Sequence, residues 1–94
     1  MEGEQDELIA QALIGREAED FLESDLGRTM LGIAEQEKSI AQEKLKSINP
    51  REVYKIETLQ NEIWRAESFR GWIEQLVSEG QQALEAYKHQ QENE

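Results

Sequence analysis

The side chains capable of acid–base or metal chemistry are few in this sequence. His89 is the only histidine, and it falls in the polar last segment KHQQENE. The chain has no cysteine, which excludes a catalytic thiolate, a disulfide and a sulfur-ligated metal. A carboxylate-bridged di-iron centre needs Glu-x-x-His pairs that face into a helical bundle, and the sequence has none. A glycine-rich phosphate loop and an EF-hand pattern are also missing.

One pair of carboxylates remains, Glu37 and Glu62. Glu37 falls in the apolar stripe of the first half of the chain, where Glu62 of the second half would face it. Two buried carboxylates bind a cation or act as acid and base, whereas two that lean into water beside Lys38 and Arg65 do neither. We favour the second arrangement. We therefore expect no catalytic residue, no metal, no cofactor and no small-molecule substrate, and predict that the protein is not an enzyme.

The segment NEIWRAESFRGWIEQL, residues 61–76, holds two tryptophans, a phenylalanine and two arginines. Stacking on nucleic-acid bases requires aromatic side chains in a positively charged groove. Here acidic residues lie three or four positions from both Arg65 and Arg70, so the arginines are expected to form local pairs on a helix. We therefore expect no nucleic-acid contact through this segment.

The net charge of −11 is unevenly distributed along the sequence. Residues 1–25 hold nine acids and one base, residues 26–48 have a net charge of +1, and residues 49–94 have a net charge of −4. Nucleic acid and acidic membranes repel such a chain. The acidity either serves solubility alone or forms an acidic surface that engages a basic protein. The residues of this acidic surface are Glu2, Glu4, Asp6, Glu7, Glu17, Glu19, Asp20, Glu23 and Asp25.

The first residues, MEGEQDELIAQALIG, are acidic and do not have the character of a signal or transit peptide. No apolar run approaches the roughly 18 residues that cross a bilayer. We therefore expect a soluble protein that does not engage a membrane.

The composition favours helix, because Glu, Gln, Ala, Leu and Lys are good helix formers and strand-like runs are missing. In INPREV, residues 48–53, Asn49 is suited to cap a helix and Pro50 to occupy its first position. Glu52 lies at the spacing of a capping box. We therefore predict a helix that begins at residue 50 and runs to about 88, after a reversal at Asn49.

Apolar residues recur at helical spacing on both sides of this reversal. The fold class predicted is all-α: a long antiparallel helical hairpin of the coiled-coil type (about 16–48 and 50–88) with a short N-terminal helix, in a three-helix or oligomeric bundle. A break near 24–27 is allowed for. We treat residues 1–94 as a single helical domain, with an acidic segment at 1–15 and a frayed tail at 89–94. The hairpin stripes are Ala18, Leu22, Leu26, Met30, Ile33, Ala34, Ala41, Leu45 and Ile48 in the first arm, and Ile56, Leu59, Ile63, Ala66, Ile73, Val77, Leu84 and Tyr87 in the second.

A second apolar face lies on the second arm, because Trp64 points about 160° away from the hairpin seam. Large apolar patches are seldom left in water, so something should cover this face. Three covers remain open: residues 4–14 folding back as a third helix, a second copy of the chain, or a foreign protein. We call this surface the tryptophan face, and its predicted partner-binding residues are Trp64, Ser68, Gly71, Trp72 and Gln75.

FLESDLGR (21–28), INPREV (48–53) and LQNEIWRAESFRGWIEQLVSEG (59–80) together resemble small all-helical proteins of tailed bacteriophages and prophages. The resemblance implies a setting, the bacterial host cytoplasm or the virion, and carries over no functional residue. With it we expect a non-enzymatic module for protein–protein interaction or oligomerisation, with self-association or a phage or host protein as partner, such as an accessory in virion assembly. The alternative is an acidic inhibitor that mimics nucleic acid and blocks a host nucleic-acid-binding enzyme, such as a defence or repair complex.

Overall fold

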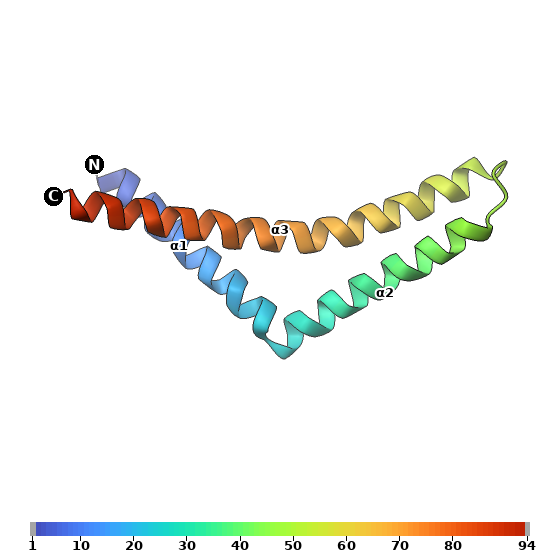
Figure 1. Ribbon diagram of the computed structural model, residues 1–94, viewed down its shortest axis with the longest axis horizontal. Helices are drawn as coiled ribbons and strands as arrows, with labels where there is room; N and C mark the ends of the chain where they lie inside the picture. Colours follow the sequence, from blue (N-terminus) through green and yellow to red (C-terminus); the bar gives the residue numbers. More distant parts are fainter. Residues whose placement is uncertain (1, 94) are drawn as a thin grey trace. The chain divides into compact units, whose positions relative to one another are not determined.

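The computed structural model describes residues 2–93, and these form three α-helices and no strand (Figure 1). α1 is Glu2–Glu23, α2 is Asp25–Ser47 and α3 is Val53–Glu92. α2 and the first part of α3 run in opposite directions on either side of the reversal at Asn49. The predicted all-α fold with a helical hairpin is confirmed, and the differences concern where the helices begin and end.

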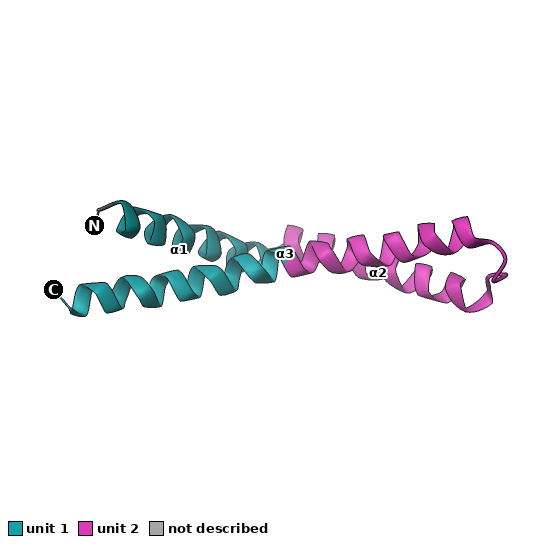
Figure 2. Cartoon of the chain, turned by 90° about the horizontal axis from the view of Figure 1, so that it is seen from above, with its two compact units in different colours: residues 1–24, 72–94 teal, residues 25–71 magenta. Residues whose placement is uncertain are grey.

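The chain divides into two compact units, which Figure 2 draws in separate colours. Unit 1 consists of residues 1–24 and 72–94, and so contains α1 and the last part of α3. Unit 2 consists of residues 25–71, and so contains α2, the reversal and the first part of α3. Each unit is thus one pair of helices, and α3 supplies a partner to both.

Asn49, the predicted helix cap, caps a turn instead, and α3 starts later than predicted. The Arg51 N–H donates to Asn49 Oδ1 over 3.0 Å, and the Glu52 N–H donates to the Asn49 carbonyl over 2.9 Å. This second bond closes a turn, so the first helical bond of α3 joins the Ile56 N–H to the Glu52 carbonyl at 3.1 Å. The predicted start at residue 50 is therefore wrong, and α3 begins at Val53.

The predicted first arm, residues 16–48, is two helices rather than one. Ser24 separates them, because its backbone N–H and its hydroxyl both donate to the Phe21 carbonyl, over 3.1 and 2.7 Å. This three-residue spacing tightens the last turn of α1 and ends the α-helical ladder there. The allowed break near 24–27 is thus present.

Two other predicted boundaries are wrong. The expected short N-terminal helix does not end at Gly15, because α1 passes through that glycine to Glu23. A glycine inside a helix costs only about 1 kcal/mol relative to alanine, which packing can offset. Fraying was also expected from residue 89 onward, but α3 continues to Glu92.

Unit 1 is held by a backbone contact between Gly15 of α1 and Gly80 of α3. A Cβ atom placed on Gly15 would lie 2.6 Å from the Gly80 Cα and 3.0 Å from the Leu76 carbonyl oxygen. Real Cβ atoms do not approach other atoms so closely, so only glycine fits at both positions. Ala18 and Ala83 are buried in the same unit, with 8% and 3% of their surface exposed. Small residues therefore set the close approach of these helices.

Unit 2 packs through an inner stripe on α2. Ala41 is 1% exposed, and Leu59 and Ala66 of α3 are also buried. Lys38 Nζ lies 3.4 Å from Glu67 Oε1, an ion pair that joins α2 to α3. The inner stripe is Gly27, Leu31, Ala34, Lys38, Ala41, Leu45 and Ile48, all buried or half-buried.

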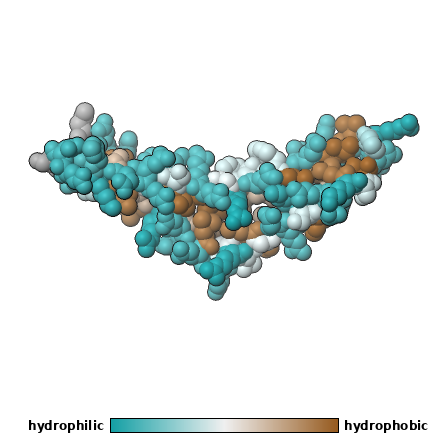
Figure 3. Space-filling view, in the orientation of Figure 1, coloured by the Kyte–Doolittle hydropathy of each residue, from teal (hydrophilic) through white to brown (hydrophobic). Residues whose placement is uncertain are grey.

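The predicted seam of the first arm combined two different faces of α2. Leu26, Met30 and Ile33 were expected in the hairpin seam, but 64%, 39% and 53% of their surface is exposed. They belong to an outer stripe with its own alternating spacing of three and four residues. Figure 3 shows hydrophobic side chains reaching the surface of the molecule. The outer stripe is Leu26, Met30, Ile33, Glu37, Ile40 and Lys44, all exposed.

No helix among the described residues is both long enough and apolar enough to span a membrane.

The glycine contact generates the first prediction. Gly15→Ala should lower the free energy of unfolding by about 1–3 kcal/mol, because the added methyl group overpacks the backbone of Gly80. Gly32→Ala is the matched control: Gly32 is also inside a helix, but a Cβ there meets nothing within 4 Å. This control should gain about 0.5–1 kcal/mol from helix propensity. Urea denaturation followed by circular dichroism measures the free energy of unfolding of both variants. A change of the same sign in both would contradict the Gly15–Gly80 contact.

Candidate functional site

The tryptophan face is exposed in the structure. Trp64 keeps 64% of its surface accessible and Trp72 keeps 58%. Both belong to α3, Trp64 in its unit 2 part and Trp72 in its unit 1 part. Exposed indoles are uncommon on isolated proteins and are the side chains most enriched at the centres of protein interfaces.

The smaller members of this face leave room between the indoles. Gly71 is exposed, and a Cβ placed on it would meet nothing within 4 Å. Ser68 is half-buried. Gln75 is exposed, and its Nε2 donates to Glu79 Oε1 over 2.8 Å. A partner side chain would therefore reach the backbone of α3 at Gly71.

Two acids fall on the arc of α3 that holds the indoles, and the base Arg65 lies about 20° beyond its edge. Within the arc of α3 from about 40° before to about 80° after Trp64, the acids are Glu57 and Glu79. Neither lysine nor arginine falls in this arc between Val53 and Glu92. The face therefore presents indoles in a weakly acidic surround.

Of the three covers left open, residues 4–14 do not cover Trp72. These residues form the first part of α1, which packs on α3 at the Gly15–Gly80 contact. Trp72 remains exposed although it belongs to the same unit as α1. Two covers remain, a second copy or a foreign protein.

The acidic surface lies almost entirely in unit 1. Unit 1 holds 13 acidic residues against Arg16 and Lys88, a net charge of −11, whereas unit 2 holds eight of each sign and is neutral. Glu19 is half-buried and accepts a bond of 3.1 Å from Gln81 Nε2. Asp20 lies 3.4 Å from Arg16 Nε. The Glu2 side chain lies outside the described part of the chain. The other predicted members are exposed: Glu4, Asp6, Glu7, Glu17, Glu23 and Asp25.

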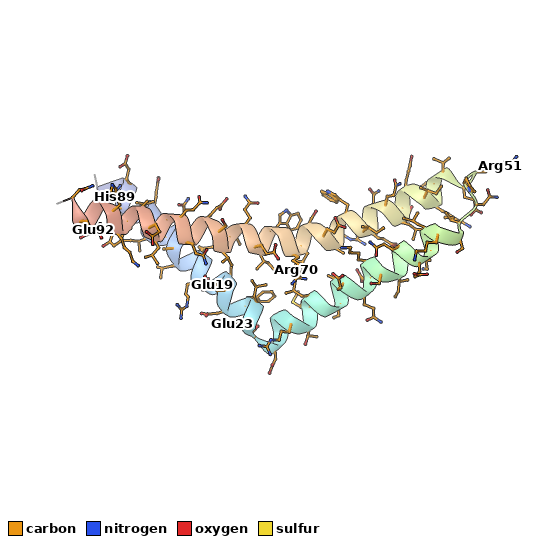
Figure 4. The ribbon with its side chains drawn as sticks, in the orientation of Figure 1. Glu19, Glu23, Arg51, Arg70, His89 and Glu92 are labelled. Carbon is orange, nitrogen blue, oxygen red and sulfur yellow. The ribbon has the colours of Figure 1, made fainter. Side chains whose placement is uncertain are left out.

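The residues first considered for chemistry are not assembled into a site. Glu37 and Glu62 line one small hollow together with Ile40 and Arg65. Among the described residues, no group of three or more histidine and carboxylate side chains is placed to hold a metal ion. His89 lies near the end of α3 (Figure 4), where its Nε2 is 3.2 Å from Asn93 Nδ2.

Sequence reasoning missed two apolar hollows in unit 2. One lies next to the reversal, has a volume of about 460 Å³ and is lined by residues including Ile48, Tyr54 and Leu59. Tyr54 is 81% exposed there, and Figure 4 shows Arg51 at the same end. The other runs along the outer stripe of α2. Helical spacing alone does not reveal it, because residues of α3 also line it.

Comparison with known proteins adds no relative. No protein-family model matches the chain, and no curated protein and no solved structure shows a significant match.

The exposure of the indoles generates the second prediction. Trp64→Ala and Trp72→Ala should each change the free energy of unfolding by less than about 1 kcal/mol, because exposed side chains contribute little to the folded core. Leu59→Ala, at a buried position of the same helix, should cost about 2–5 kcal/mol. Thermal and urea unfolding compare the three variants. Tryptophan variants as unstable as Leu59→Ala would mean that the indoles are packed.

Proposed function

We propose that this protein is a non-catalytic interaction module that binds a partner protein through the tryptophan face of α3. The observation that supports the proposal is the exposure of Trp64 and Trp72, at 64% and 58%. Covering the exposed part of each indole releases about 2–4 kcal/mol, at ~25 cal/mol per Å² and 150–250 Å² per side chain. Two such anchors offset much of the cost of association.

The charges around the face favour a foreign protein over a second copy. Two copies joined through this face would bring Glu57 and Glu79 of one chain towards the same acids of the other, and no base lies in the arc to neutralise them. Like charges placed opposite one another across an interface disfavour that pairing. The partner proposed is therefore a protein with an apolar pocket rimmed by lysine or arginine.

The setting proposed follows from the resemblance to small helical phage proteins. In that setting the partner is a phage or host protein, and the module acts as an accessory in virion assembly in the bacterial cytoplasm or the virion. The two units then have separate uses. The neutral unit 2 serves packing, and the acidic unit 1 serves solubility and selects basic partners.

A second candidate function rests on the concentration of charge in unit 1. A helix pair with 13 acids and two bases presents a dense row of carboxylates. Such a surface resembles the charge of a nucleic-acid backbone and suits an inhibitor that occupies the basic channel of a host nucleic-acid-binding enzyme. This mode depends on ion pairing, whereas docking of the indoles depends on apolar burial.

The third prediction separates these two candidates by salt and by mutation. Tagged protein is incubated with bacterial lysate, a retained protein is identified and purified, and its dissociation constant is measured by calorimetry. The Trp64→Ala/Trp72→Ala variant should bind at least about 30-fold more weakly, the loss expected when 2 kcal/mol of hot-spot energy is removed. Leu13→Ala, which removes a 61% exposed side chain on α1, should bind like the unmodified chain.

Binding through the tryptophan face should persist between about 0.15 and 1 M salt, where the screening length falls from about 8 to 3 Å. Equal affinity of the double tryptophan variant and the unmodified chain would refute the proposal. If the complex is also lost at high salt and on Glu4→Gln/Asp6→Asn/Glu7→Gln, the acidic inhibitor replaces it.

A further inference from the structure

α2 carries two apolar stripes, but within unit 2 another helix packs against only one of them. The inner stripe meets α3 through Ala41, Leu59 and Ala66. The outer stripe repeats with the spacing 26, 30, 33, 37, 40 and 44, which alternates four and three residues as in a coiled-coil seam. Its aliphatic members are 39–64% exposed. A helix with two such stripes is typical of a bundle with more than two helices.

Side chains of α3 lie beside the outer stripe of α2 and line hollows together with it. Arg65, Ala66 and Phe69 line a hollow of about 240 Å³ with residues of α2 that include Met30 and Ile33. An adjoining hollow of about 200 Å³ shares Glu37 and Arg65 with it and extends to Ile40 and Glu62. The two hollows share Glu37 and Arg65, and together we call them the hairpin groove.

We propose that the hairpin groove binds the outer stripe of a second copy of this chain, so that two units 2 form a four-helix bundle. This assembly buries the aliphatic residues that a single copy leaves in water. It also places α2 in contact with three helices, as its two stripes require. The surface is separate from the tryptophan face, and the inference does not depend on the proposed function.

Charge selects a second copy as the occupant. Unit 2 has eight acids and eight bases, so its own charges do not oppose the pairing of two units 2, and the net charge of −11 of each chain comes from unit 1. The groove also holds both signs, Glu37 and Glu62 beside Arg65. A surface that contacts its own copy about a two-fold axis must be self-complementary in this way.

The spacing of the stripe is compatible with an antiparallel register centred between Ile33 and Glu37. When two outer stripes run antiparallel, Ile33 of one copy lies beside Glu37 of the other, and Met30 lies beside Ile40. Glu37 is then the only acid in the seam. Arg65, which lines both hollows, provides its opposite charge. A polar residue at a seam position fixes the register and lowers the stability of the assembly.

The fourth prediction concerns the oligomeric state, which size-exclusion chromatography with light scattering measures. The unmodified chain should elute at twice its mass of 10.9 kDa. Ile33→Asp should raise the dissociation constant at least about 100-fold, because each dimer would bury two unpaired carboxylates. Its fold should survive, since Ile33 is 53% exposed in the single chain. Ser39→Asp is the matched control: it adds the same charge to α2, about 120° away from Ile33.

Glu37→Leu tests the same seam without risk to the fold of one copy. Completing the apolar stripe should lower the dissociation constant at least about tenfold while the assembly stays a dimer. The Trp64→Ala/Trp72→Ala variant should also remain a dimer, so a failure of the proposed function leaves this result unchanged. An unmodified chain that is monomeric, a dimer insensitive to both Ile33→Asp and Glu37→Leu, or a dimer lost only in the tryptophan variant would each overturn the inference.

Discussion

The structure depends on helix pairs that meet through small residues. Gly15 and Gly80 bring two backbones into direct contact in unit 1, and Ala41 and Ala66 are among the buried residues of unit 2. Small side chains allow close approach, but they remove little apolar area from water. A pair of helices packed in this way gains modest stability by itself. The larger apolar side chains are consequently left on the outside, where they define the surfaces that another protein can cover.

Several features of the fold were predictable from local chemistry. Asn49 and Pro50 marked the reversal, and the Asn49 side chain does bond the Arg51 N–H, although a closed turn moves the helix start to Val53. Ser24 lay inside the segment where a break was allowed. The passage of α1 through Gly15 was not predictable, because the need for glycine arises from a backbone 65 positions away in the sequence. Contacts between distant segments leave no local signal.

The candidate surfaces were predictable to different degrees. Helical periodicity correctly placed the tryptophan face away from the seam, because Trp64 is nearly opposite the apolar residues of α3. The same periodicity failed on α2, where inner and outer stripes lie only about 100° apart and merge into one broad apolar sector. Exposure separates Ile33 from Ala34, and periodicity alone does not. The hairpin groove was therefore invisible until the helices were paired.

α3 contributes one uninterrupted helix of 40 residues to both units. If α1 detaches, residues 72–92 are left as a solitary helix, and helices of that size are marginal in water without tertiary support. Melting that begins at the end of α3 would then advance towards Trp72, so loosening of unit 1 erodes one anchor of the tryptophan face while α2 still holds the other half of the helix.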